Sequence, residues 1–307
     1  MNLPHDLSLA VIIPTYNRVA ELSRCLQSIN LQSLPRDKWE VIAVNDGGVD
    51  VTEIVQSFGN NFRAFYQLNQ GPGAARNFGA TLTTASVLLF IDDDCTADPN
   101  WLKEVYENIR PGFILGGKVI NKVKESMFSE SSQVLIDFLL IEYNEGSDLQ
   151  FFTTNNLAIC RVDFLQIGGF SLDFYTSAGE DREFCVRAKR FGTRLVFHQP
   201  MLVFHFHHLD LFRFIALHVK YGRAAWTFHQ IINRGNWGIK SYPQWNFYKR
   251  LLTFPFSLNE YTPKKKLLLS ACLFLSQGSV GFGYLYERIR FKKTGPYTPP
   301  VKDPFPG

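Results

Sequence analysis

Short apolar runs alternate with segments of helical spacing through the first 110 residues, and this alternation constrains the fold more than any other feature. Leu9–Ile13, Trp39–Val44, Phe62–Tyr66 and Val87–Ile91 have the length and β-rich composition of buried strands. The helical segments between and after them are Ala20–Ile29, Val51–Phe58, Gly73–Leu82 and Pro99–Ile109. This order predicts parallel strands joined by right-handed crossovers, with helices covering the sheet.

After about residue 112 the pattern becomes less regular. We predict strands at Phe113–Ile120, Phe151–Cys160 and Thr193–Phe197, a helix at Glu180–Phe191, and mainly helical structure from Leu209 onward. The expected fold class is therefore α/β: a Rossmann-like mixed sheet flanked by helices, with a helical C-terminal extension. The chain has 307 residues, enough for one large domain or two small ones, and we place the division at residue 208.

Three polar clusters directly follow predicted strands. Pro14-Thr15-Tyr16 ends the first strand, Asn45-Asp46 the second, and Asp92-Asp93-Asp94 the fourth. In sheets of this kind, ligands bind outside the carboxyl ends of the strands. Because the carboxyl ends of parallel strands meet at one rim, we expect these clusters to share one site.

The triplet Asp92-Asp93-Asp94 carries the strongest signal. Three adjacent carboxylates repel one another, and a bound cation usually offsets this cost. Mg²⁺ and Mn²⁺ are usually bound by one or two carboxylates, and phosphate oxygens complete the coordination shell. The alternative is a solvated acidic loop in which Asp94 or Asp98 caps the following helix.

Two further segments point to anion binding and to proton transfer. Arg76 follows small residues at a predicted helix start, from which it can reach phosphates or a base. Glu180 and Asp181 open another predicted helix. They are either helix-capping residues or a general base, since a like-charged neighbour raises a carboxyl pKa and a helix N-terminus lowers it.

Three histidines, His205, His207 and His208, follow the last predicted strand. Three histidines within four positions are as consistent with a metal or phosphate role as with a structural one. The five cysteines show neither a zinc spacing nor a disulfide framework, so we expect reduced thiols, as in a cytosolic protein. We also expect no secretory signal at the N-terminus.

The end of the chain is basic and contains a long uncharged run. Residues 241–307 hold ten Lys and Arg against three Asp and Glu. Leu267–Tyr286 has no charged residue and is long enough to span a bilayer, but its Ser and Gly residues dilute its hydrophobicity. An interfacial helix, a buried helix and a true span all stay open. Residues 294–307, rich in Pro and Gly, are expected to be poorly ordered.

Taken in order, these motifs resemble glycosyltransferase family 2 enzymes of the GT-A fold. The matching segments are Val11–Arg18, Val44–Gly47, Gly73–Gly79, Leu89–Cys95, Asn156–Ala158, Gly168–Phe170 and Gly179–Asp181. The resemblance covers roughly residues 8–195, so we assign a GT-A catalytic domain to residues 1–208. The mainly helical region 209–307 matches no family motif, and its composition favours acceptor binding or membrane association.

The resemblance also implies a role for each motif. The nucleotide-sugar site would comprise Pro14, Thr15, Tyr16, Arg18, Asp46, Arg76, Asp92, Asp93 and Asn156. Asp92 and Asp94 match the DxD motif that binds the metal and the donor diphosphate. Asp181 matches the catalytic base, with Glu180 beside it, and His208 or His205 would complete the metal site.

We therefore expect an inverting glycosyltransferase that uses Mn²⁺ or Mg²⁺. It would move a sugar from a nucleotide sugar, by family default a UDP-sugar, to a saccharide or lipid-linked acceptor in polysaccharide synthesis. We expect it in the cytoplasm or on the cytosolic face of the cell membrane, with residues 262–293 at the membrane surface. No nucleic-acid partner is expected, because the basic excess adjoins an apolar run.

Two alternatives compete with this interpretation. The first is a non-catalytic module that binds a nucleotide sugar or a carbohydrate. The second is a phosphatase of the haloacid dehalogenase type, since Asp92–Thr96 fits its DxDxT pattern. That pattern normally follows the first strand of its domain, whereas three predicted strands precede it here.

Overall fold

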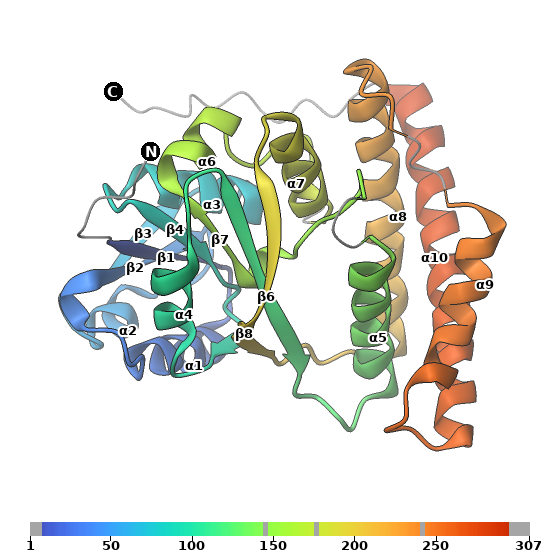
Figure 1. The fold of residues 1–307 in the computed structure, drawn as a ribbon, viewed down its shortest axis with the longest axis horizontal. Coiled ribbons are helices and arrows are strands. Elements are labelled where there is room, and N and C mark those ends of the chain that lie inside the picture. Colours follow the sequence, from blue (N-terminus) through green and yellow to red (C-terminus); the bar gives the residue numbers. More distant parts are fainter. Residues whose placement is uncertain (1–7, 144–146, 175–177, 240–242, 295–307) are drawn as a thin grey trace.

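The computed structural model describes residues 8–143, 147–174, 178–239 and 243–294 (Figure 1). Within them, eight strands form one sheet in the order β3-β2-β1-β4-β7-β6-β8-β5. The strands are β1 Leu9–Thr15, β2 Trp39–Asp46, β3 Phe62–Gln67, β4 Val87–Phe90, β5 Cys95–Ala97, β6 Phe113–Asn121, β7 Leu157–Cys160 and β8 Arg194–His205. The helices are α1 Val19–Asn30, α2 Thr52–Gln56, α3 Pro72–Thr81, α4 Trp101–Asn108, α5 Met127–Glu142, α6 Arg161–Ile167, α7 Glu180–Arg190, α8 Leu211–Arg234, α9 Trp245–Thr253 and α10 Pro263–Thr294.

The first half of the sheet is parallel and buried on both faces. Leu9, Val11 and Ile13 of β1 belong to the core cluster beneath α1, α2 and α4. Ala10 and Ile12 belong to the cluster on the opposite face, beneath α3, α6 and α7. Successive side chains of a strand point to opposite faces, so a continuous apolar run is what a strand covered on both faces requires.

The second half of the sheet is mixed. β7 runs antiparallel to both β4 and β6, and β5 runs antiparallel to β8. β6 and β8 pair in parallel with a register shift between Gly117 and Lys118. A Cβ at Gly117 would lie 2.0 Å from the Met201 carbonyl oxygen, so the shift requires a glycine there.

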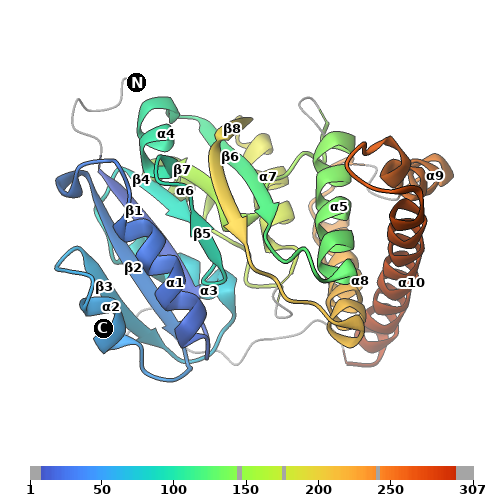
Figure 2. The ribbon, with the colours of Figure 1, turned by 90° about the horizontal axis from the view of Figure 1, so that it is seen from below.

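Four helices form a layer beside the sheet. Figures 1 and 2 show α5, α8, α9 and α10 standing side by side next to the β6–β8 half. The axes of α8 and α10 approach closely through Gly222 and Gly283. A Cβ at Gly222 would lie 2.0 Å from the Val280 carbonyl oxygen, and one at Gly283 would lie 2.1 Å from that of Val219. The layer thus includes α5, which precedes residue 208 in the sequence.

The predicted elements need two corrections. The strand predicted at Phe151–Cys160 covers only Leu157–Cys160, because residues 154–156 form a 3₁₀ turn and Phe151 and Phe152 pack into the core. The strand predicted at Thr193–Phe197 continues to His205. The sequence interpretation also missed β5, α5 and α6. The end predicted to be poorly ordered lies, apart from Thr294, outside the described residues.

Candidate active site

A cavity of about 960 Å³ lies at the carboxyl ends of β1, β2 and β4. Most of the side chains identified from the sequence line it: Pro14, Thr15, Tyr16, Arg18, Asp46, Arg76, Asp92, Asp93, Asp94, Glu180 and Asp181. The parallel register explains the convergence, since Thr15 lies beside Asn45 at the ends of β1 and β2. The three rim clusters therefore meet in one cavity, as the sheet topology requires.

Two side chains from the β1 end contact the acidic triplet. Thr15 Oγ1 donates to Asp93 Oδ2 at 2.8 Å. Arg18 Nη1 lies 3.1 Å from Asp93 Oδ1 and 3.0 Å from Asp94 Oδ2. Burial nevertheless raises the pKa of Asp93 to about 6. In this arrangement the Thr15 and Arg18 side chains bind carboxylates of the acidic triplet.

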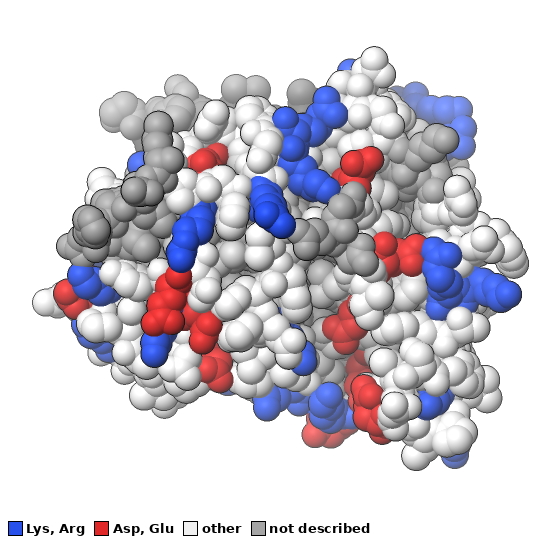
Figure 3. Space-filling model, in the orientation of Figure 1, with Lys and Arg blue, Asp and Glu red and all other residues white. Residues whose placement is uncertain are grey.

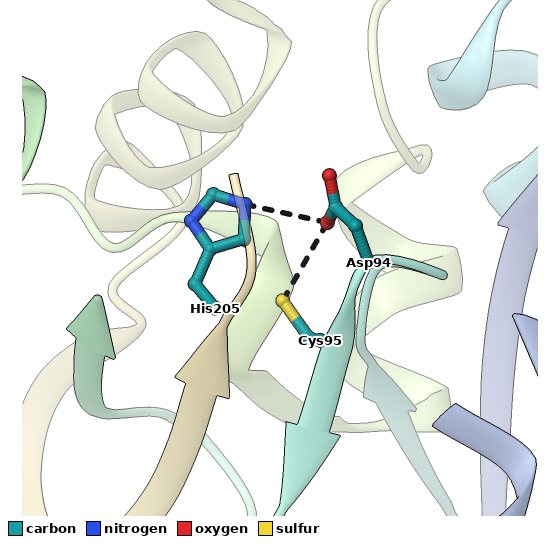
Figure 4. Close-up of side chains that lie close together, drawn as sticks. All are labelled: Asp94, Cys95 and His205. Carbon is teal, nitrogen blue, oxygen red and sulfur yellow. Dashed lines mark hydrogen bonds and ion pairs between the residues drawn. The ribbon is translucent and has the colours of Figure 1, made fainter. Parts of the chain in front are cut away.

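Asp94 and His205 form the best candidate metal site. Figure 4 shows dashed lines that join the Asp94 carboxylate to the His205 ring and to the Cys95 sulfur. His205 Nε2 lies 3.3 Å from Asp94 Oδ1, because His205 pairs with Cys95 in the β5–β8 register. Burial would raise the pKa of Asp94, but the hydrogen bond and charge of His205 outweigh it and hold that pKa below its usual range.

The donor set fits a divalent cation of the Mn²⁺ or Mg²⁺ type. A carboxylate and an imidazole facing an open cavity leave room for phosphate oxygens. Cys95 is fully buried in the core, and its sulfur is a soft ligand, whereas Mg²⁺ and Mn²⁺ favour carboxylate, carbonyl and water oxygens. Asp94 and His205 are therefore the better ligand pair of the three.

The other two histidines lie on opposite sides of the chain. His207 lines the cavity and stacks on His205, with 5.0 Å between ring centroids. Burial, together with His205, lowers its pKa to about 4, so the ring is neutral near pH 7. His208 is exposed and does not line the cavity. Of the two candidates named from the sequence, the structure thus brings His205, not His208, to the carboxylates.

Arg76 connects the acidic triplet to the start of α7. The residue is 3% exposed, and its guanidinium has Nη2 2.6 Å from Asp92 Oδ1 and Nη1 3.0 Å from Glu180 Oε1. Gly179, with φ of 90°, turns the chain so that Glu180 begins α7 facing Arg76. Glu180 is therefore tied to Arg76, which leaves Asp181 as the freer of the two adjacent carboxylates.

Asp181 has the environment of a general base. It lines the cavity, and its carboxylate accepts a hydrogen bond from the Arg182 backbone amide at 2.7 Å. Burial and the charge of Glu180 raise the pKa of Asp181 to about 7, while Arg76 acts in the opposite direction. A carboxylate with a pKa near the working pH is well matched to accepting a proton.

Two residues of the predicted nucleotide-sugar site have mainly structural partners. Asn156 is 1% exposed and does not line the cavity. Its amide donates to the Lys118 and Met201 carbonyls and accepts from Trp101 Nε1, so it braces the β6–β8 shift. Asp46 does line the cavity, but its carboxylate accepts from Gln67 Nε2 and from two backbone amides of the following loop, those of residues 70 and 71.

The structure adds cavity residues that the sequence interpretation missed. Asn155, adjacent to Asn156, faces the cavity, as do Arg182 and Tyr221. Burial and the nearby Asp181 raise the pKa of the Tyr221 hydroxyl. Arg182 was detectable as the neighbour of the Glu180-Asp181 pair, whereas Tyr221 lies in α8 and no local pattern marks it.

The family model described as glycosyl transferase family 2 matches residues 10–168. The chain belongs to glycosyltransferase family 2. The matched region contains β1 to β4 and the acidic triplet, and it ends before α7. The family assignment replaces the phosphatase alternative.

Several curated glycosyltransferases are similar to this chain. Validoxylamine A glucosyltransferase of Streptomyces hygroscopicus subsp. jinggangensis is 26% identical over 223 residues, covering 61% of this chain and 53% of that protein. Poly(ribitol-phosphate) beta-glucosyltransferase of Bacillus spizizenii is 25% identical over 199 residues, covering 59% of this chain and 29% of that protein. The chain thus spans about half the length of the first of these relatives and less than a third of the second.

Solved structures share the fold at low sequence identity. Mannosyltransferase PcManGT from Pyrobaculum calidifontis, in complex with GDP-Man and Mn²⁺, has a TM-score of 0.59 at 16% identity and covers 95% of this chain and 91% of its own. TarS from S. aureus has a TM-score of 0.51 at 18% identity, covering 93% of this chain and 55% of its own. The architecture is therefore GT-A, as the sequence motifs predicted.

Proposed function

We propose that this family 2 protein is an inverting glycosyltransferase that takes a sugar from a nucleotide sugar and builds a glycan. The observation that carries the proposal is the single cavity in which the acidic triplet and Asp181 meet. The triplet suits a metal–diphosphate, and Asp181 suits an acceptor hydroxyl. Curated relatives named as glucosyltransferases, one acting on poly(ribitol-phosphate), support the class of reaction.

The donor would lie along the β1–β2–β4 rim. Tyr16 is 50% exposed at this rim and offers a face for the base, while Asp46 lies at the adjoining loop. Asp94 and His205 would hold the divalent cation, with Asp92 at its side. When bound, that cation neutralises charge on the diphosphate. A UDP-sugar is the first donor to test, and PcManGT with GDP-Man and Mn²⁺ makes GDP-sugars the second.

The chemistry at Asp181 follows from its protonation. Asp181 accepts the proton of the acceptor hydroxyl as that oxygen attacks the anomeric carbon from the face opposite the nucleotide. The bond from the anomeric carbon to the diphosphate oxygen breaks as the new glycosidic bond forms, so the anomeric configuration inverts. Arg76 pairs with both Glu180 and Asp92 and so ties the start of α7 to the acidic triplet.

Donor binding can be tested by thermal shift with UDP-, GDP- and dTDP-sugars, each with and without Mn²⁺. A ligand at 100 times its Kd stabilises the fold by about 2.7 kcal/mol. We expect one donor to stabilise the wild type only with Mn²⁺, to lose this effect in Asp94→Ala, and to retain it in Asp181→Asn. No stabilisation by any donor would reject the proposed donor site.

Transfer should separate the two variants further. Asp181→Asn is expected to lower transfer by about 10²- to 10⁴-fold, the usual contribution of a general base. Near-normal transfer by this variant would reject Asp181 as the base. Donor binding by the wild type without transfer to any acceptor would favour the non-catalytic module, and a product that retains the donor's anomeric configuration would reject inversion.

We further propose that the chain works at the cytosolic face of a membrane. We also propose that a catalytic domain ends, and a mainly helical region begins, near residue 208. Residues Pro263–Lys293 form a single helix that is long and apolar enough to cross a membrane. Within the most apolar 18-residue stretch of this helix, 28% is buried in the protein. Its length and composition alone are weak support. A nucleic-acid partner is not proposed, since acidic and basic side chains are interspersed on the face in Figure 3. Deleting residues 262–307 without changing partition onto anionic vesicles would refute membrane contact.

A further inference from the structure

The cavity extends well beyond the catalytic carboxylates. It continues between α5, α8, α9 and α10, and we call this extension the helical arm. Its walls include Leu139 of α5, Phe228 of α8, Phe247 of α9 and Val280 of α10. A nucleotide sugar is polar throughout and needs no apolar arm of this kind.

The helical arm reaches the outer face of α10. Gly281 and Leu285 both line the cavity, yet both are exposed, Leu285 by 55%. A Cβ added at Gly281 would meet no atom within 4 Å, so the glycine leaves open space beside the helix. The cavity therefore has a mouth on α10 as well as at the sheet rim.

The surface around that mouth is apolar with basic ends. The exposed side of α10 presents large hydrophobic residues over about six turns: Leu267, Leu268, Phe274, Leu275, Phe282, Leu285 and Ile289. Exposed basic residues lie at both ends, Lys264 at the first and Arg288, Lys292 and Lys293 at the other. An apolar helix face with basic flanks is the pattern of a helix that lies in the interface of an anionic bilayer.

A cation stands where the helical arm meets the catalytic carboxylates. Arg182 directly follows Asp181 and lines the cavity. Its guanidinium carbon lies 5.1 Å from the ring centroids of both Tyr143 and Phe228. Among the described residues, its buried Nε has no hydrogen-bond partner. The aromatic rings hold the guanidinium at the wall of the cavity, where its positive charge can attract an anionic group.

We propose that the acceptor is a lipid-linked saccharide: its hydrocarbon chain enters through the mouth on α10 and lies in the helical arm, its anionic linkage faces Arg182, and its hydroxyl reaches Asp181. This rests on the proposed glycosyltransferase function and narrows its acceptor to one class. The order of the three groups along the cavity matches the order of head group, linkage and chain in such a lipid. The basic-flanked face of α10 would rest on the membrane that supplies the lipid.

Chain binding can be measured without knowing the natural acceptor. A dansyl-labelled fatty acid, whose fluorescence rises in an apolar site, is titrated into the full-length protein. It is then displaced with geranylgeraniol and with geranylgeranyl phosphate. Gly281→Leu fills the mouth and should weaken probe binding at least about tenfold, or about 1.4 kcal/mol.

Gly278→Leu is the matched control, because Gly278 is also an exposed glycine of α10 with open space at its Cβ but does not line the cavity. It should bind the probe as the wild type does, and both variants should partition equally onto anionic vesicles. Ala225→Phe fills the helical arm from α8 and should repeat the loss. Equal losses in Gly278→Leu and Gly281→Leu, or no probe binding by the wild type, would overturn the proposal.

The anionic linkage has its own variant. Arg182→Met keeps an apolar stem among the rings and removes the charge. The wild type should prefer the phosphate over the alcohol, and Arg182→Met should lose that preference while still binding geranylgeraniol. An unchanged preference would overturn the assignment of Arg182. Donor thermal shifts run on the same samples keep the tests separate: donor binding without probe binding rejects the helical arm alone, and the absence of donor binding rejects the proposed function.

Discussion

Replacing Glu180 by Gln should move the pH dependence of sugar transfer to lower pH. Asp181 has a pKa raised to about 7, first by burial and then by the adjacent Glu180. Asp92 also raises this pKa, whereas Arg76 and the Arg182 backbone amide lower it. As a base, Asp181 works only when deprotonated, so transfer by the wild type should rise as pH increases through about 7.

The size of this rise follows from the pKa. A carboxyl group with a pKa of about 7 is about a tenth deprotonated near pH 6 and about nine-tenths near pH 8, so the rate should increase about tenfold between them. Glu180→Gln removes the like charge but leaves the burial in place. The pKa of Asp181 should therefore fall, yet stay above that of an exposed aspartate, and the variant's rise should occur at lower pH.

The assay is kcat measured from about pH 5 to pH 9 at saturating donor, acceptor and Mn²⁺. The midpoint is informative even if Glu180→Gln lowers the maximal rate by loosening Arg76. Arg76→Lys is the control, since it disturbs the same ion pairs and keeps Glu180 charged. A wild-type profile that is flat between about pH 6 and pH 8 would refute the raised pKa. An unmoved midpoint in Glu180→Gln would refute the contribution of Glu180.

Two stability predictions test the framework of the site. Gly222→Ala should destabilise the fold by about 1–3 kcal/mol in urea unfolding, since its Cβ would collide with the Val280 carbonyl. The control Gly278→Ala, on the open face of α10, should be neutral or stabilise the fold by up to about 1 kcal/mol. Equal effects of the two substitutions on stability would refute the close packing of α8 and α10. Asn156→Ala should cost about 3 kcal/mol or more, since three buried polar partners lose their hydrogen bonds. The neighbouring Asn155→Ala should change transfer more than stability, and the reverse pattern would restore Asn156 to the donor site.

The parallel half of the fold was predictable because its signals are local. An apolar run buried on both faces, as in Leu9–Ile13, has few alternatives to a central strand, and the polar residues after it mark the rim. The antiparallel half lacks such signals. β5 has only three residues, and its pairing with β8, which brings His205 to Asp94, depends on contacts between positions far apart in the sequence.

The same limit explains why residue type alone does not show which polar residues face the cavity. Asn156 and Asn155 are adjacent and chemically identical, and only the path of the 3₁₀ turn determines which one faces the cavity. His205 and His208 differ in the same way. A sequence motif identifies a polar residue that the fold needs, but burial and partners decide whether it binds a ligand or holds two strands together.

The uncharged run Leu267–Tyr286 allowed three interpretations from sequence, and the two sides of α10 explain why. One side packs against α8, where Gly222 and Gly283 bring the backbones together, and has the character of a buried helix. The other side is exposed and apolar, as an interfacial helix is. Because the glycine contacts fix α10 to the layer that encloses the helical arm, the apolar face and the mouth at Gly281 would approach a bilayer together. The proposed membrane contact and the proposed acceptor entry would then be coupled, and a variant that detaches α10 from α8 should lose both.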